Sequence, residues 1–177
     1  MRNVVLYIAA SLDGYIASSD GSADWLPTPP PGEDYGYEEF LSTVDATLLG
    51  RVTYEQVLTF GEWPYPTLTN YVFTHQPPTE AAHPSVQFVS TDPVEFVQLL
   101  RHEPGGTIWL IGGSTLAAPL LAAGLVDELM LFTVPLLLGA GIPLWHPQKH
   151  PQPLQLLRTH TWPDGLTLLH YRLLKVA

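Results

Sequence analysis

Two glycines and two hydroxyl residues stand together where an apolar run ends, in Trp109-Leu110-Ile111-Gly112-Gly113-Ser114-Thr115. The run predicts a buried strand, a tight turn and the start of a helix. Adjacent glycines let a ligand touch the main chain. The free N–H groups and positive dipole end of the following helix suit a phosphate. A plain strand-to-helix turn explains the same residues, so both interpretations stay open at this point.

A second junction of this kind adds a cation. The apolar stretch Ala46–Leu49 ends at Gly50, and Arg51, Val52 and Thr53 begin a helix predicted to reach about Leu58. A guanidinium and a hydroxyl are groups that bind phosphate oxygens through hydrogen bonds. The two junctions together predict a site for a nucleotide phosphate.

The composition limits the possible partners. The chain of 177 residues fits one domain, 1–177, with a sizeable core. Its formal net charge is −10 and its seven Lys and Arg residues form no run, which argues against a nucleic-acid surface. An anionic ligand must therefore be held locally. Because there is no cysteine, no signal-like segment and no long apolar run, we expect a cytoplasmic protein without a membrane partner.

The elements that position these residues alternate between strands and helices, and then end in a hairpin. Helices are expected at 34–43, at 51–58, after Asp92 (a cap followed by Pro93) and after Gly113. Asp164-Gly165 between two strand-like runs is a strong hairpin signal. This order of strands and helices predicts an α/β domain with a mixed sheet. The expected strands are at 4–10, 15–17, 46–49, 69–74, 86–89, 107–111, 126–134, 154–162 and 166–174.

Two other polar groups are assigned to the surface. His146 and His150 have a spacing seen in metal sites, but Pro147 and Pro151 argue against a regular helix across them. We expect a surface loop there and no metal site. Asp127-Glu128 is interpreted as a solvated entrance to a strand.

Several stretches together resemble one superfamily. They are 4–17, 49–55, 111–116, 125–129, 138–141 and the final hairpin. In order and spacing they are similar to the dihydrofolate reductase-like superfamily, and most of all to the branch of the C-terminal reductase domain of the riboflavin-biosynthesis deaminase-reductase. The resemblance covers nearly the whole chain. It implies a three-layer α/β/α domain with a mostly parallel eight-stranded sheet, NADPH bound across the carboxyl edge of that sheet, and a homodimer.

The resemblance also implies roles for individual residues. The pyrophosphate of NADPH is expected at Gly112 and Gly113, and the adenosine 2′-phosphate at Thr74 and His75. Ala9 and Ile16 are expected near the nicotinamide, with backbone groups of Ala9 holding its carboxamide. The remaining cofactor-binding residues are Ser114, Thr115 and Leu116 after the first junction, and Gly50, Arg51 and Thr53 at the second.

A candidate acid follows from the same resemblance. Asp34 stands sixteen residues before Gly50, as the acid of folate reductases does, and Thr133 matches its partner. An acid in an apolar cleft has a raised pKa and assists protonation as hydride arrives. Asp34 also fits an ordinary helix cap, and the alternatives Glu38, Tyr35 and Tyr37 stay open.

The sequence departs from the folate pattern at one place. No cation precedes the third strand, where Pro66-Thr67-Leu68-Thr69 stands, so folate is a poor substrate. We expect an NADPH-dependent oxidoreductase that transfers hydride to a small heterocyclic (pterin- or pyrimidine-like) or carbonyl substrate. The alternative is a nucleotide-binding protein of the same fold without turnover, a sensor or scaffold.

Overall fold

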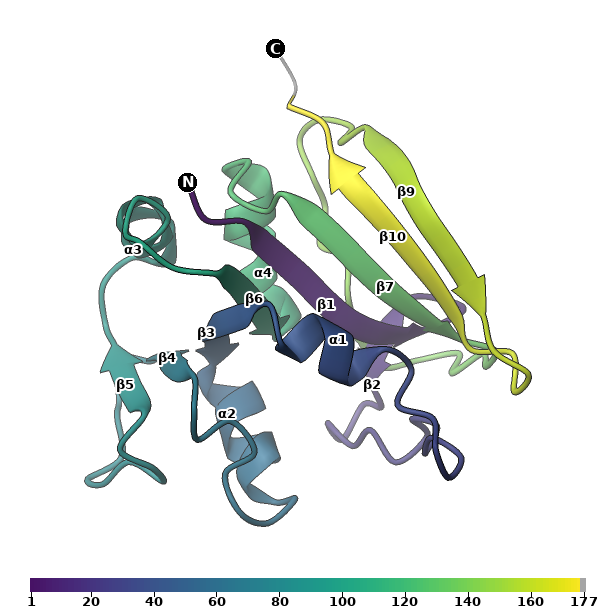
Figure 1. The fold of residues 1–177 in the computed structure, drawn as a ribbon, viewed down its shortest axis with the longest axis horizontal. Helices are drawn as coiled ribbons and strands as arrows, with labels where there is room; N and C mark the ends of the chain where they lie inside the picture. Colours follow the sequence, from purple (N-terminus) through teal and green to yellow (C-terminus); the bar gives the residue numbers. More distant parts are fainter. Residues whose placement is uncertain (176–177) are drawn as a thin grey trace.

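The computed structural model of the protein describes residues 1–175. Figure 1 shows one sheet with helices before and behind it. In chain order the elements are β1 (Val4–Ser11), β2 (Tyr15–Ala17), α1 (Tyr37–Leu41), β3 (Val44–Gly50), α2 (Arg51–Leu58), β4 (Thr69–Phe73), β5 (Val86–Val89), α3 (Pro93–Leu100), β6 (Thr107–Gly112), α4 (Ser114–Ala122), β7 (Glu128–Val134), β8 (Ile142–Pro143), β9 (Leu154–Thr161) and β10 (Thr167–Leu173).

The main sheet has eight strands in the order β5-β4-β3-β6-β1-β7-β10-β9. The first six strands of this order, from β5 through β4, β3, β6 and β1 to β7, run parallel to one another. Strand β10 is antiparallel to both β7 and β9. The predicted α/β fold with a C-terminal antiparallel pair is confirmed. Because the carboxyl ends of parallel strands share one edge, the ends of β1, β3 and β6 lie together.

Helices cover both faces of this sheet, which confirms the predicted three layers. On one face, α3 and α4 pack on Val4 and Leu6 of β1. On the other face, α1 packs through Phe40 on Val5 and Tyr7 of β1, and α2 packs beside β3 and β4. In Figure 1, α1 crosses in front of the sheet and α4 lies behind it. Strand alternation thus decides which helix each side chain of β1 faces.

Helix α3 begins as the sequence predicts, and α1 does not. The Asp92 carboxylate accepts hydrogen bonds from the backbone N–H groups of Val94 and Glu95, as a cap should. Helix α1 begins at Tyr37 rather than at Asp34, because Tyr35 and Gly36 have positive φ angles of 56° and 77° and cannot continue a helix. Strand β8, which pairs with β2 in a separate small sheet, was not predicted.

The interpretation of Asp127 as a solvated strand entrance is wrong. Its carboxylate accepts two hydrogen bonds from Arg101, at 2.8 and 2.9 Å, and one from the Val4 backbone N–H at 2.8 Å. The Arg101 side chain is 10% exposed, so this ion pair joins α3, β1 and the start of β7 in a largely buried position. Among residues 1–175, no helix is long and apolar enough to cross a membrane.

Candidate cofactor and substrate site

The two glycine junctions meet in space. Strands β3 and β6 are neighbours, and Leu49 is aligned with Gly112. A β-carbon at Gly50 would lie 3.7 Å from the backbone nitrogen of Gly113. A β-carbon at Gly113 would in turn lie 3.5 Å from the hydroxyl oxygen of Thr53. The structure therefore brings together the residues that the sequence assigns to one phosphate site.

The helices that start at these junctions have open first turns. Gly50 and Gly113 are the N-cap residues of α2 and α4, and within the described residues no side chain caps either helix. The first N–H groups of a helix lack intrahelical partners, so they remain available to an anion. Thr115 is exposed at the first turn of α4, whereas Leu116 is buried beneath it in the core and supports the turn from below.

His146 reaches the same turn from a distant segment. Its Nε2 atom lies 3.1 Å from the hydroxyl oxygen of Ser114, which is buried at the start of α4. The sequence places His146 in a surface loop, and no local signal indicates this contact. The structure thus adds an imidazole to the edge of the predicted pyrophosphate site.

Strand β1 separates from β6 beside these junctions. It pairs with β6 from Val4 to Leu6, but with β7 from Val5 to Ser11. Beyond Leu6, the edge of β1 that faces β6 has no aligned strand partner among residues 1–175, and Ala9 lies in this part. The Tyr7 carbonyl in this part accepts a hydrogen bond from the Trp109 indole at 3.1 Å, and the backbone groups of Ala9 would be available for the expected role.

A separate two-stranded sheet follows β1 and holds Ile16. Ile16 is in β2, which pairs with β8. The Asp13 carboxylate before β2 accepts hydrogen bonds from the Ser11 hydroxyl (2.6 Å), the Gly139 N–H (2.7 Å) and the Leu138 N–H (3.1 Å). These bonds, led by that from Ser11, hold the pKa of Asp13 below its usual value. An ionised Asp13 therefore ties the loop after β1 to the segment after β7.

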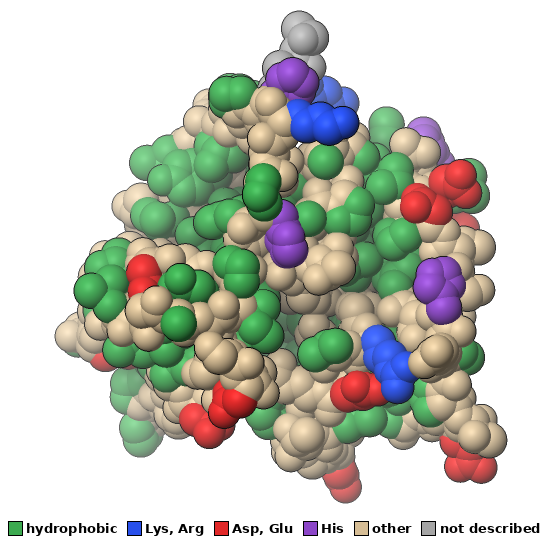
Figure 2. Space-filling model, turned by 180° about the vertical axis from the view of Figure 1, so that it is seen from behind, with side chains coloured by type: hydrophobic (Ala, Val, Ile, Leu, Met, Phe, Trp, Pro, Cys, Tyr) green, Lys and Arg blue, Asp and Glu red, His purple; other side chains and the backbone are tan. Residues whose placement is uncertain are grey.

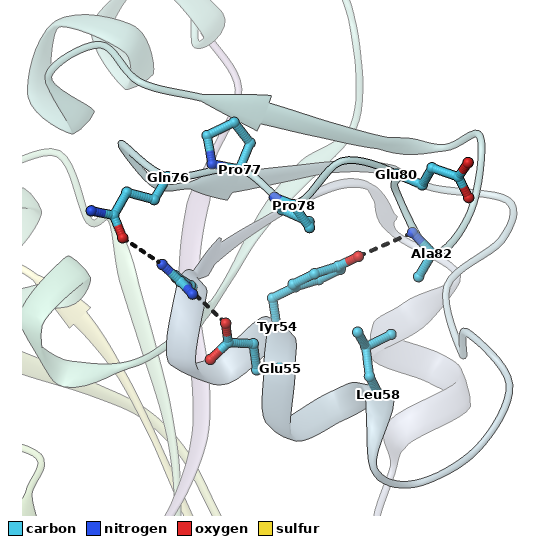
Figure 3. Close-up of a pocket in the computed structure, with 9 residues that line it drawn as sticks. Tyr54, Glu55, Leu58, Gln76, Pro77, Pro78, Glu80 and Ala82 are labelled. Carbon is cyan, nitrogen blue, oxygen red and sulfur yellow. Dashed lines mark hydrogen bonds and ion pairs between the residues drawn. The ribbon is translucent and has the colours of Figure 1, made fainter.

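Arg51 reaches the end of β4. Its guanidinium donates to Glu55 at 2.7 Å and to the Gln76 side chain at 3.2 Å, and the Gln76 N–H donates to the Thr74 hydroxyl at 3.0 Å. His75 lies exposed in the same turn. Arg51, Glu55 and Gln76 line a cavity of about 470 Å³ between α2 and the loop of residues 76–82. Figure 3 shows this cavity, in which the Tyr54 hydroxyl accepts a hydrogen bond from the Ala82 N–H. The residues expected around a 2′-phosphate are thus neighbours.

The expected raised pKa of Asp34 is wrong. Its carboxylate accepts hydrogen bonds from the backbone N–H groups of Glu38 and Gly36, both at 2.8 Å. These two bonds, that from Glu38 first, lower the pKa of Asp34. Asp34 therefore fixes the start of α1, the alternative role that the sequence left open.

The expected partnership of Asp34 with Thr133 is also wrong. Phe132 and its neighbours Met130 and Val134 pack on the α1 face of the sheet, so Thr133 between them points to the α4 face. Asp34 lies on the α1 side, where its charge acts on Tyr7. No hydrogen bond joins Asp34 to Thr133 among the described residues.

The α1 face carries tyrosines instead. The Tyr7 ring stacks on Phe40 at 4.3 Å and meets Tyr37 edge-on at 6.3 Å. Burial, followed by the charges of Tyr37 and Asp34, raises the pKa of Tyr7. Burial also raises the pKa of Tyr37, against a hydrogen bond with Tyr65. Sequence reasoning named Tyr37 but missed Tyr7, although its place in the apolar strand before Ala9 was visible.

The remaining alternatives to Asp34 occupy different places. The Tyr35 hydroxyl donates to the Asp164 carboxylate at 2.5 Å, and this bond raises the pKa of Tyr35 to about 12. Glu38 is exposed in the first turn of α1. Tyr35 is thus committed to the hairpin turn, and Tyr37 is the alternative that lies beside Tyr7.

An eight-stranded, mostly parallel sheet between two layers of helices, with the N-termini of α2 and α4 at its carboxyl edge, defines a three-layer α/β protein. The model of the RibD C-terminal domain matches residues 2–168, so the chain belongs to that family. Two proteins of Bacillus subtilis (strain 168) are similar over most of the chain. The uncharacterized protein YwjB is 40% identical over 96% of this chain and 97% of its own. The uncharacterized protein YyaP is 31% identical over 96% of this chain and 94% of its own.

Solved structures agree with this assignment. A putative riboflavin biosynthesis protein from Shewanella sp. PV-4 is 28% identical, with a TM-score of 0.87 over 99% of this chain and 100% of its own. A deaminase/reductase from Thermotoga maritima, diaminohydroxyphosphoribosylaminopyrimidine deaminase/5-amino-6-(5-phosphoribosylamino)uracil reductase, is 17% identical. Its TM-score is 0.72, and the match covers 98% of this chain but 57% of that protein, so it supports the fold alone.

Proposed function

We propose that this protein is an NADPH-dependent oxidoreductase that transfers hydride to a small heterocyclic (pterin- or pyrimidine-like) or carbonyl substrate in the cytoplasm. The observation that carries the proposal is the meeting of two uncapped helix N-termini at Gly50 and Gly113. The RibD family match and the similarity to the putative riboflavin biosynthesis protein from Shewanella sp. PV-4 support the reductase class. Few basic side chains appear on the face in Figure 2, in keeping with a net charge of −10. Anion binding therefore depends on local donors.

The chain fits this cofactor through backbone donors and short polar side chains. Gly112, Gly113, Ser114 and Thr115 would hold the pyrophosphate, while Gly50, Arg51 and Thr53 line the second turn. Thr74 and His75 would lie toward the 2′-phosphate, and Ala9 and Ile16 toward the nicotinamide. NADPH supplies the hydride, and the protein aligns the acceptor and excludes water.

Substrate orientation is assigned to the α1 side of the crevice. Asp34 is ionised at neutral pH because its pKa is lowered, and its charge helps keep the Tyr7 hydroxyl protonated. Because its raised pKa makes the Tyr7 hydroxyl a weak acid, this hydroxyl would orient the substrate by hydrogen bonding, while the proton that balances the hydride would come from solvent water. We keep Asp34 as the predicted catalytic carboxylate, acting together with Tyr7 rather than with Thr133.

A nucleotide-binding protein without turnover is the second candidate. The lowered pKa of Asp34 favours it, because a carboxylate that caps a helix is a poor proton donor at neutral pH. Steady consumption of NADPH with a pterin, pyrimidine or quinone-like acceptor would exclude this candidate.

The test of the main proposal is a fluorescence titration with NADPH followed by a turnover assay with those acceptors. We expect saturable binding at micromolar concentrations and loss of NADPH absorbance with at least one acceptor. Absence of saturable binding would overturn the proposal. Binding without consumption of NADPH would favour the second candidate.

We also propose that the protein is a homodimer that pairs through β9. This edge strand is exposed at all eight residues, and three of its leucines (Leu154, Leu156 and Leu157) are 38–53% exposed. Natural proteins rarely leave an apolar edge strand uncovered. A groove lined by Trp145, Leu173 and Leu174 adjoins it. A second copy supplies an identical edge, which makes a two-fold interface possible.

A further inference from the structure

Arg51 is the cation nearest the expected 2′-phosphate position, and two of its nitrogens already have partners. The Nε atom donates to a Glu55 carboxylate oxygen at 2.7 Å, and an Nη atom donates to Gln76 at 3.2 Å. The dashed lines at Glu55 and Gln76 in Figure 3 mark these two bonds. Both members of the Arg51–Glu55 pair are about half exposed (46% and 55%), so they can exchange partners without repacking the core.

Among the described residues, Arg51 is the one Lys or Arg side chain that lines the cavity beside α2. The sequence has no Lys or Arg between Arg51 and Arg101. Arg101 is bound to Asp127, and Arg2 is bound to Asp45. The cavity beside Arg51 carries further negative charge on Glu80. A dianionic phosphate arriving here therefore depends on a single guanidinium that a carboxylate already holds.

We propose that Glu55 is a specificity-determining residue that restrains the preference of the site for NADPH over NADH. The inference rests on the proposed function. A carboxylate and a phosphate compete for the same donor edge of a guanidinium. Binding of a 2′-phosphate must displace or share the Arg51–Glu55 bond and bring a second negative charge beside the first. NADH has a neutral 2′-hydroxyl at this position. Its binding therefore neither breaks the Arg51–Glu55 bond nor brings a second negative charge beside Glu55.

The test is a matched pair of glutamine substitutions, Glu55→Gln and Glu62→Gln. Each removes one negative charge, but Glu62 lies after α2, is exposed and is not in contact with Arg51 among the hydrogen bonds of residues 1–175. Dissociation constants for NADPH and NADH are measured for the wild-type protein and both variants. For Glu55→Gln we expect the ratio of the NADH to the NADPH constant to rise about threefold or more. For Glu62→Gln we expect little change.

A double substitution separates a direct effect from a general one. In an Arg51→Gln background, Glu55→Gln should change the ratio less than it does in the wild-type background, because competition for the guanidinium is gone and only the repulsion between the two negative charges remains. An equal change in the ratio for Glu55→Gln and Glu62→Gln would overturn the inference. So would an unchanged ratio in Glu55→Gln while both dinucleotides still bind. Failure of NADPH to bind the wild-type protein would instead overturn the proposed function.

Discussion

Gly50 and Gly113 lie so close together that a β-carbon on Gly50 would be 3.7 Å from the backbone nitrogen of Gly113. This proximity joins the carboxyl ends of β3 and β6 and brings the N-termini of α2 and α4 to one place. Two helix ends with free N–H groups then face a common space. In a chain with a net charge of −10, this pair of ends is the feature that best suits a diphosphate.

Bulk at Gly113 should block this space. In Gly113→Val, the added side chain contacts the Thr53 hydroxyl and covers the first turn of α4, so we expect NADPH affinity to fall about tenfold or more. Fluorescence titration measures the loss. Ala123→Val adds two methyl groups at the other end of α4 and is the control. Unchanged binding in Gly113→Val would contradict a phosphate role for this turn.

Asp34→Asn removes the negative charge and keeps one of the two backbone hydrogen bonds that the carboxylate accepts, because the amide retains a single acceptor oxygen. We expect Asp34→Asn to lower turnover about tenfold or more, while the NADPH dissociation constant changes less than about twofold. Steady-state kinetics and titration are compared on the same preparations. Glu39→Gln, an exposed change on the same helix, should leave both unaffected. Equal losses in turnover and binding would show a structural role alone.

The bond between Tyr35 and Asp164 should stabilise the protein over a defined pH range. The bond lowers the pKa of Asp164, so this stabilisation is present above about pH 4 and disappears as the pH falls through the lowered value. It raises the pKa of Tyr35 to about 12, so the stabilisation is present below about pH 10 and disappears as the pH rises toward that value.

Tyr35→Phe removes this bond. We expect a lower midpoint of thermal unfolding at pH 7, and a difference from the wild-type protein that shrinks on acidification below about pH 4. Circular dichroism melting curves across the pH range measure it. Tyr171→Phe, on β10, is the control. A difference that stays constant from pH 3 to pH 7 would mean that the lost bond to Asp164 is not its cause.

The ion pair between Arg101 and Asp127 should contribute strongly to stability. Asp127→Asn leaves a largely buried guanidinium without its counter-charge, and we expect the free energy of unfolding to fall by about 3 kcal/mol. Urea unfolding gives the value. Asp24→Asn makes the same chemical change at an exposed position and should have little effect. Similar losses in the two variants would refute the special contribution of the pair.

The proposed homodimer depends on an apolar edge. Leu156→Lys places a charge on β9, and we expect the protein to become monomeric. Size-exclusion chromatography with light scattering gives the mass. Leu99→Lys, at a position on α3 that is 73% exposed, is the control and should leave the mass unchanged. A wild-type protein of monomer mass would rule out the dimer.

The sequence by itself determined the local elements and the phosphate-binding character of their junctions. Gly50 and Gly112-Gly113 stand directly after apolar runs, Asp92-Pro93 marks a helix start, and Asp164-Gly165 marks a hairpin. These signals depend on backbone freedom and hydrogen bonds between residues that are neighbours in the chain. They therefore predict the α/β order and the position of each junction without any knowledge of long-range packing.

Tertiary structure alone decided which side chains face one another. A shift of one residue moves a strand side chain to the opposite face, which is why Phe132 rather than Thr133 lies on the side of Asp34. The contacts of Ser114 with His146 and of Arg51 with Gln76 join segments 32 and 25 residues apart. Such contacts are set by how the elements pack, and no local spacing in the chain records that arrangement.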